Sequence, residues 1–245
     1  MVRSMTMRGV RVAVLAAGIA VAAVAGLAAG EAVAVEPGTY VYTEGGNAYG
    51  TLTVKGDRFS IETLGANAHT CELDGTVHGQ AGTAKGDAGD SEPCRFTVSG
   101  SQGRLRIDTG NSDACRQFCG MRARFEGEYR KAPASCTAHA IGARLEHAHG
   151  AYAKKQYADA RDTLAALIDD CKLFMSWIET DSVRSDLALA HYHLGENAQC
   201  LKVLADTRAI QYPDELPPAD ADSYRSTGNA VLFNEKLCKT AARKQ

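Results

Sequence analysis

The chain has 245 residues, of which 45% are hydrophobic and 23% are charged, and its formal net charge at pH 7 is −2. This composition is typical of a globular protein with room for one or two domains, and it excludes a disordered chain. The slightly acidic balance argues against general binding to nucleic acid, which requires a basic surface.

Residues 1–34 have the pattern of a secretory signal peptide. Three arginines give the segment a positive start, an apolar run rich in alanine covers residues 12–30, and Ala-Val-Ala at 32–34 offers a cleavage site of small residues. The alternative is an uncleaved membrane anchor, because the apolar run is nearly long enough to span a bilayer. Cleavage removes three Arg and one Glu, which changes the formal net charge to −4. We therefore expect a periplasmic or secreted protein without a membrane span after cleavage.

The cysteines all follow this segment, and an even number of cysteines in an exported chain indicates disulfides rather than free thiols. The sequence has no Cys-x-x-Cys pair, so it supports neither a zinc ribbon nor a thioredoxin-type redox site. We expect disulfides among Cys71, Cys94, Cys115, Cys119, Cys136, Cys171, Cys200 and Cys238.

Residues 36–131 are predicted to form an antiparallel β domain. Between Gly38 and Tyr129 apolar residues alternate with polar ones, which is the period of a strand with one face in water. Turn signals rich in Gly, Asn and Asp separate the segments, and no helix lies between them, so a small barrel or sandwich is the expected fold. The pattern predicts strands near 39–43, 48–54, 58–64, 69–78, 81–85, 94–98, 104–108 and 121–130.

Cys71 and Cys94 fall on the core-facing parity of their predicted strands. We expect a Cys71–Cys94 disulfide across the sheet and a Cys115–Cys119 clip in the loop, although four cysteines allow three pairings. A disulfide-clipped barrel of this size behind a signal peptide resembles the small periplasmic lysozyme inhibitors. The resemblance concerns architecture and size, and it implies an inhibitor of an envelope or cell-wall enzyme.

Five arginines fall on the outward parity of the last three predicted strands. Arg side chains offer planar paired donors to phosphate or carboxylate, so this face is a possible anion-binding surface. The alternative is a solvated face on which these residues pair with acidic neighbours across the strands. The residues are Arg95, Arg104, Arg106, Arg122 and Arg124.

Residues 136–240 are predicted to be helical. The hydrophobic period changes from 2 to 3.6 after a short linker at 131–135 that contains Pro133. Two helices of similar length bring Cys136 near Cys171, which predicts a disulfide between them. A second bridge, Cys200–Cys238, would tie the last helix to the second hairpin. Helices are expected at about 138–155, 158–171, 178–194, 197–209 and 221–238. The predicted fold class is therefore α+β with two domains.

A layout of small and aromatic residues recurs after 40 residues in this half. Ala148, Tyr157 and Ala160 in the first unit and Ala188, Gly195 and Cys200 in the second lie where two helices would cross. Over about 136–210 the chain resembles a tetratricopeptide repeat, but its unit is 40 rather than 34 residues long and only two units are visible.

The tetratricopeptide resemblance implies a concave face that binds a protein or peptide. The residues that this implies for partner binding are His149, Tyr152, Tyr192 and His193. The alternative interpretation is that both tyrosines simply pack between helices.

No metal site, cofactor or catalytic set is expected. The pairs His147-x-His149 and His191-x-His193 point away from each other on a helix, so neither pair can chelate a metal. The sequence contains none of the common motifs for a nucleophile, a metalloprotease or a phosphate loop. We expect a non-catalytic binding or scaffold protein whose helical domain holds a protein or peptide partner in the cell envelope, not nucleic acid. The alternatives are the barrel-based inhibitor and an unrecognised envelope hydrolase.

Overall fold

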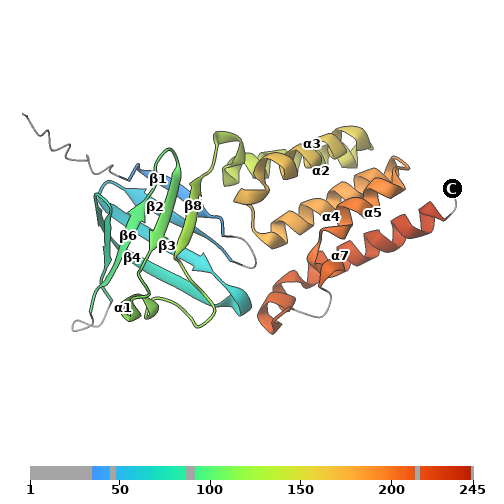
Figure 1. The fold of residues 1–245 in the computed structure, drawn as a ribbon. Coiled ribbons are helices and arrows are strands. Elements are labelled where there is room, and N and C mark those ends of the chain that lie inside the picture. Colours follow the sequence, from blue (N-terminus) through green and yellow to red (C-terminus); the bar gives the residue numbers. More distant parts are fainter. Residues whose placement is uncertain (1–34, 45–47, 87–91, 213–215, 244–245) are drawn as a thin grey trace, which may run out of the picture. The chain divides into compact units, whose positions relative to one another are not determined.

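The computed structural model describes residues 35–44, 48–86, 92–212 and 216–243. The predicted signal peptide lies outside these residues. The chain forms a closed antiparallel β-barrel followed by a helical region, so the α+β fold class is confirmed (Figure 1).

The barrel is closed because each strand pairs with the next along the chain and the last strand pairs with the first. Strand β8 runs antiparallel to β1, with Tyr42 opposite Tyr129. Closure leaves no free sheet edge, and it decides for a barrel over a sandwich. The strands are β1 (Gly38–Tyr42), β2 (Tyr49–Lys55), β3 (Arg58–Leu64), β4 (Thr70–His78), β5 (Ala81–Ala84), β6 (Cys94–Ser99), β7 (Arg104–Asp108) and β8 (Gly127–Lys131).

Aromatic side chains fill the inside of the barrel. Phe96 packs edge-to-face on Phe59 and on Phe125, with ring centroids 5.2 and 5.8 Å apart. A Cβ atom at Gly82 would lie 2.2 Å from the Phe96 ring, so glycine at this position makes room for that ring. Alternation of apolar and polar residues along β3 and β6 places the rings of Phe59 and Phe96 on the core side, and the segment before β8 supplies Phe125.

The predicted strand at 121–130 is correct only in its second half, because β8 begins at Gly127. The segment before it makes a turn, in which the Ala123 N–H donates to the Gly120 carbonyl at 3.0 Å. It then passes so close to the loop after β3 that a Cβ atom at Gly65 would lie 2.2 Å from the Arg122 carbonyl oxygen. Alternating side chains in 121–126 therefore reflect packing of a covering loop, not pairing in the sheet.

The two disulfides expected in the barrel were wrong in their pairing. Cys71 bonds to Cys119, and Cys94 bonds to Cys115. Strand β5 lies between β4, which carries Cys71, and β6, which carries Cys94, so a direct bond between these two would have to cross a strand. The loop that contains α1 (Asp113–Arg116) instead turns back over the sheet and brings one cysteine to each strand.

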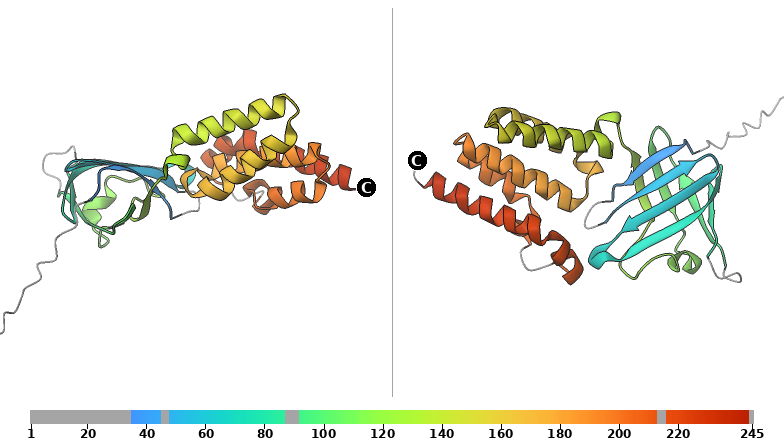
Figure 2. Two further views of the ribbon diagram at one scale, coloured as in Figure 1. Left: turned by 90° about the horizontal axis from the view of Figure 1, so that it is seen from above. Right: turned by 180° about the vertical axis from the view of Figure 1, so that it is seen from behind.

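The helical region consists of antiparallel hairpins and a long final helix. Helices α2 to α5 pack in chain order, and α7 packs against both α4 and α5. Figure 2 shows these helices side by side in two views. Single turns of 3-10 helix, α6 and irregular segments join them. The helices are α2 (Ala138–Ala153), α3 (Tyr157–Cys171), α4 (Trp177–His193), α5 (Asn197–Ala205), α6 (Arg208–Gln211) and α7 (Pro218–Ala242).

The turn inside each hairpin has the same build, 40 residues apart. Lys155 has φ +60° and Gly195 has φ +77°, so in both turns the backbone reverses through the left-handed region. The Lys155 N–H donates to the Tyr152 carbonyl at 2.9 Å, and the Gly195 N–H donates to the Tyr192 carbonyl at 3.0 Å. The following N–H, that of Gln156 or Glu196, donates at 2.9 Å to the carbonyl five residues earlier in each unit. The two turns therefore have the same structure, and they are separated by the 40 residues of the layout seen in the sequence.

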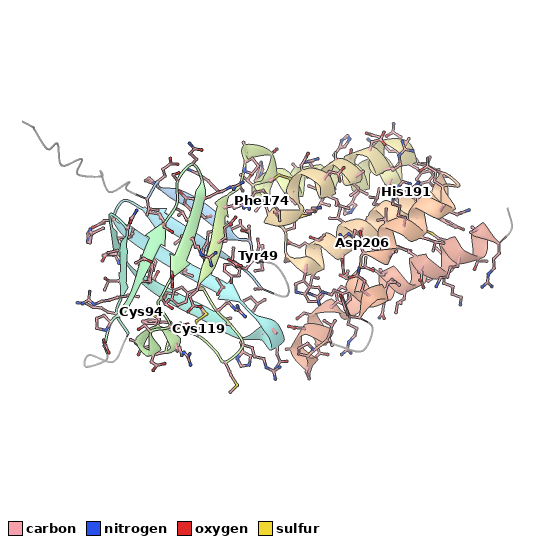
Figure 3. All side chains as sticks on the ribbon, in the orientation of Figure 1. Tyr49, Cys94, Cys119, Phe174, His191 and Asp206 are labelled. Atoms are coloured by element: carbon pink, nitrogen blue, oxygen red, sulfur yellow. A yellow bond between two sulfur atoms is a disulfide. The ribbon has the colours of Figure 1, made fainter. Side chains whose placement is uncertain are left out.

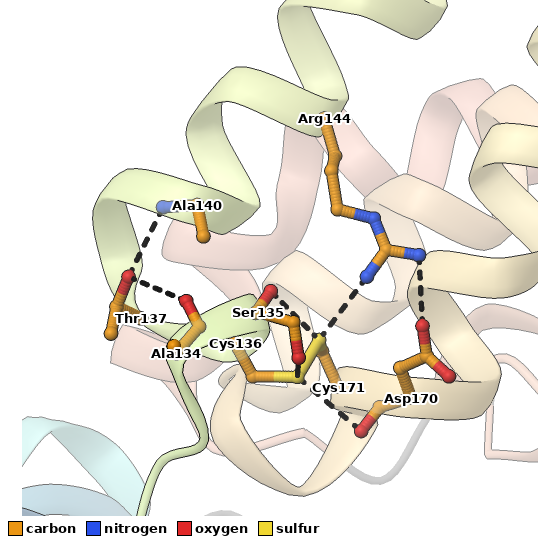
Figure 4. The surroundings of a disulfide bond; sticks show 8 residues. All are labelled: Ala134, Ser135, Cys136, Thr137, Ala140, Arg144, Asp170 and Cys171. Atoms are coloured by element: carbon orange, nitrogen blue, oxygen red, sulfur yellow. Dashed lines mark hydrogen bonds and ion pairs between the residues drawn. A yellow bond between two sulfur atoms is a disulfide. The ribbon is translucent and has the colours of Figure 1, made fainter.

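Both disulfides expected in the helical region are confirmed. Cys136–Cys171 ties the start of α2 to the end of α3, and Cys200–Cys238 ties α5 to α7. Arg144 lies beside the first bridge, where its guanidinium donates to the Cys171 sulfur at 3.6 Å and to the Asp170 carboxylate at 3.1 Å (Figure 4). Across the described residues, none of the helices combines the length and the apolar character needed to cross a membrane.

Candidate partner-binding surface

Four rings gather where α2 and α4 end and α3 begins, and we call Tyr152, Tyr157, Tyr192 and His193 the aromatic turn cluster. The His193 ring stacks on Tyr157 at 4.4 Å with an interplanar angle of 9°. Tyr152 meets both of these rings edge-to-face, at 5.3 and 5.5 Å, and Tyr192 meets His193 at 5.3 Å. Both hairpins therefore contribute rings to one group, with geometries that aromatic pairs prefer.

The members of the aromatic turn cluster differ in burial. His193 is exposed, and Tyr152, Tyr157 and Tyr192 are half-buried. Tyr152 packs on a small core of alanines that includes Ala160, whereas Tyr192 packs against the core around the Cys200–Cys238 bridge. Burial, and then the charges that Tyr157 and Asp186 can carry, raise the pKa of the Tyr152 phenol. The two tyrosines thus support the fold, while the histidine faces outward.

His149 lies beside this cluster and links α2 to α4. It precedes Tyr152 by three residues, which places both on one helix face. Its Nε2 atom is 2.9 Å from the Asp186 carboxylate on α4. The His149 side chain is 61% exposed and that of Asp186 is 39% exposed, so this pair is open to solvent.

A charged network links the turn between α4 and α5 to α3. Glu196 is held by His191, whose Nδ1 is 2.6 Å from its carboxylate, and by Arg161 on α3, whose Nη1 donates to it at 2.7 Å. The hydrogen bond from His191 is the main reason that the pKa of Glu196 is lowered, and the Arg161 charge adds to it. Figure 3 labels His191 in this network.

The structure brings together the four residues expected to bind a partner. Tyr152, Tyr192 and His193 touch within the aromatic turn cluster, and His149, one turn before Tyr152 on α2, lies within hydrogen-bond distance of Asp186 on α4. Sequence reasoning assigned Tyr157 to the crossing of the helices and did not single out Asp186 as a site residue. The stacking of Tyr157 on His193 depends on how α3 packs against α4, which helical periodicity alone does not give.

The five arginines lie on two strands and in one loop. Arg122 and Arg124 precede β8 in the covering loop, so their expected place on the last strand is wrong. In the β6–β7 register Thr97 is opposite Asp108, the last residue of β7. Arg95 therefore lies beyond the end of β7, away from Arg104 and Arg106 on that strand. Arg106 is 3.6 Å from the Glu44 carboxylate.

Within the described part of the chain, no group of three or more His, Cys, Asp or Glu side chains is placed to hold a metal. Comparison with protein-family models, with curated proteins and with solved structures gave no match.

Proposed function

We propose that this chain is an exported, non-catalytic binding protein whose helical part holds a protein or peptide partner of the cell envelope. The observation that carries this proposal is the aromatic turn cluster, in which two hairpins of the same build present rings on one partly exposed surface. Tyrosine rings offer large, rigid contact areas that lose little conformational entropy on binding. The His149–Asp186 pair adds directional hydrogen bonds at the rim of this surface.

Four disulfides support a location outside the reducing cytoplasm. Together with the leader-like residues 1–34 they favour a periplasmic or secreted protein. The two-unit repeat also agrees with the tetratricopeptide-like interpretation, in which stacked hairpins offer an extended binding surface.

The test uses the full-length chain exported to an oxidising compartment. A partner is captured from the envelope fraction of the source cells, identified, and its affinity is then measured with purified components. We expect His149→Ala/His193→Ala to weaken binding by about tenfold or more, because both side chains are exposed and belong to the proposed surface. His139→Ala is the matched control, since His139 is exposed near the start of α2.

Equal affinity of the double variant and the wild type would contradict the partner surface. Replacing the two histidines is a sharper test than replacing Tyr152 and Tyr192, because these tyrosines pack against the core and their loss would also lower stability.

The second candidate is the barrel-based inhibitor, and the closed barrel with two disulfides favours it. Inhibition of a lysozyme by the full-length chain, unchanged in the His149/His193 double variant, would support this function in place of the first. A turnover assay on envelope polymers in the same preparation tests the envelope hydrolase.

A further inference from the structure

The end of α4 opposite the aromatic turn cluster carries a second group of chemically distinctive side chains. Trp177, the only tryptophan of the chain, begins α4, and the Arg208 guanidinium lies over its ring at 5.4 Å. Trp177 also packs on Tyr224 of α7, with ring centroids 4.9 Å apart. Because α4 rises about 1.5 Å per residue, this group and His193 are separated by about 24 Å. The two sites are therefore distinct.

The buried carboxylate of Asp181 fixes the position of this group. It is only 2% exposed, and its Oδ2 atom accepts hydrogen bonds from the Tyr224 hydroxyl at 2.8 Å and from the Arg208 main-chain N–H at 2.7 Å. Its Oδ1 atom accepts from Arg184 at 3.2 Å. Three elements thus meet at one buried carboxylate, which fixes the start of α6 and with it the base of the Arg208 side chain.

The helical wall of a surface pocket includes Trp177, Arg184, Arg208 and the neighbouring Lys172, Leu173 and Met175. Asp206, labelled in Figure 3, lies on the same wall. The aromatic ring and the aliphatic side chains give this wall an apolar part, and the basic groups give it a cationic part. With Asp181 included, the helical residues that line the pocket carry three positive and two negative charges.

Arg208 and Arg184 differ in how their charges are matched. Arg184 pairs with Asp181 and approaches Asp206 at 4.0 Å. The Arg208 guanidinium lies over the ring of Trp177 and over that of Tyr212, 5.4 and 5.6 Å from their centroids, and no carboxylate in the described ranges pairs with it. A cation held by ring faces keeps its planar N–H donors available to an anion.

We propose that this pocket binds a carboxylate joined to an apolar or aromatic group, with the carboxylate on Arg208 and the apolar group beside Trp177 and Leu173. The excess of one positive charge on the helical wall suits a single negative charge, and the two nearby aspartates disfavour a doubly charged phosphate. Such a ligand is either a free small acid or the C-terminus of a peptide. This inference does not rest on the aromatic turn cluster.

Trp177 provides the measurement, because its fluorescence is the only tryptophan signal in the chain. The full-length oxidised protein is titrated with phenylacetate, with its neutral amide and with phenyl phosphate at low ionic strength. We expect a saturable change with phenylacetate, weaker binding in added salt, and no saturable change with the amide. Arg208→Gln should weaken phenylacetate binding by about tenfold or more, the effect of losing a charged hydrogen-bonding partner.

Two features keep this variant interpretable. Arg208→Gln leaves intact the main-chain N–H that bonds to Asp181, and circular dichroism reports whether the helices persist. Arg225→Gln is the matched control, because Arg225 is an exposed arginine of α7 that pairs with Asp222. This control should bind phenylacetate as the wild type does.

The proposal is overturned if the amide binds as well as the acid, or if Arg208→Gln binds phenylacetate with unchanged affinity. Tighter binding of phenyl phosphate would overturn the choice of a single negative charge. An acetylated dipeptide that ends in phenylalanine, with a free or an amidated C-terminus, then separates the two sources of the ligand. A peptide C-terminus as the source requires the free-acid dipeptide to bind more tightly than phenylacetate, whereas weaker binding assigns the pocket to small acids.

Discussion

The Tyr42 hydroxyl lies in the wall of the barrel, where it donates to the Glu126 carbonyl at 2.9 Å. Burial, and then the neighbouring carboxylates of Glu44 and Glu126, raise the pKa of this phenol to about 12. Since the neutral form is favoured by folding, the contribution of Tyr42 to stability is complete below pH 10 and is lost as the pH rises from 10 to about 12.

Tyr42→Phe is therefore expected to do two things. It removes one late-ionising phenol from an ultraviolet titration of the folded protein, and it makes the loss of stability between pH 10 and 12 shallower. At neutral pH the variant should be about 1 kcal/mol less stable, because a hydrogen bond is lost. Tyr212→Phe, at an exposed position, is the control. An unchanged alkaline limb in Tyr42→Phe would contradict this account.

Glu196 is expected to act at the acid end of the pH range. Its pKa is lowered in the folded chain by the hydrogen bond from His191 and by Arg161, so its stabilising contribution is present above the unfolded pKa and is lost as the pH falls. Glu196→Gln should lower the thermal midpoint at neutral pH and flatten its decline in acid. Glu146→Gln, on the exposed face of α2, should leave the whole profile in place. Parallel profiles for the wild type and Glu196→Gln would count against the network.

Some contacts of single residues could not be predicted from the sequence. Parity placed Cys71 and Cys94 on the core side of their strands, and both are fully buried. It could not show that β5 separates them or that the loop around α1 returns over the sheet. Likewise, the tetratricopeptide resemblance implied Tyr152 and His193 as site residues but not the stacking of Tyr157 on His193, because that contact joins residues 36 positions apart in the chain.

At the level of elements, periodicity predicted most of the fold. Seven strands and the helices α2, α3 and α4 lie within two residues of their expected bounds, because each carries an apolar pattern of period 2 or 3.6 over several residues. Helix α5 ends at Ala205 rather than at 209. The prediction of the last strand was wrong over 121–126, because this covering loop has the same alternation of apolar and polar residues as a strand. The short α6 and the extension of α7 to Pro218 were not predicted, since proline at the start of a helix also fits a loop.

Two Gly→Ala substitutions in the helical region are expected to change stability in opposite directions. Gly195→Ala should destabilise the chain by about 1 kcal/mol, because φ there is +77° and a side chain disfavours the left-handed region. Gly142→Ala, the same change inside α2, should stabilise it by about 0.5–1 kcal/mol through helix propensity. At both sites the added Cβ meets no atom within 4 Å, so packing does not contribute. Denaturant unfolding measures both, and equal signs would refute the argument.

The Cys200–Cys238 bridge joins α7 to the second hairpin. Replacing both cysteines by alanine is expected to lower the free energy of unfolding by about 2–4 kcal/mol, because the unfolded chain regains freedom and the buried site loses packing. The measurement is denaturant unfolding under non-reducing conditions. Reducing the disulfides of the wild type should lower its free energy of unfolding by at least the same amount. A reductant that leaves this free energy unchanged would contradict a structural role for the bridges.

At the level of the whole molecule, the disulfide pattern is directly testable. Non-reducing proteolysis with mass mapping should yield Cys71–Cys119, Cys94–Cys115, Cys136–Cys171 and Cys200–Cys238, with no thiol that reacts before unfolding and reduction. A Cys71–Cys94 peptide would refute the barrel described above. Each bridge closes within the barrel or within the helical region, so the linker around Pro133 is spanned by none of them.

Strands β1 and β8 also determine how the chain would respond to tension. Tyr40, the middle residue of β1, is opposite Lys131 at the end of β8, so the beginning of β1 and the end of β8 lie at the same end of this antiparallel pair. A pull on these two ends would therefore break the hydrogen bonds between the strands one after another, at low force. The disulfides would limit the extension, because the segments closed by Cys71–Cys119, Cys136–Cys171 and Cys200–Cys238 cannot be stretched out. The protein would then behave as a short tether with a fixed maximum reach.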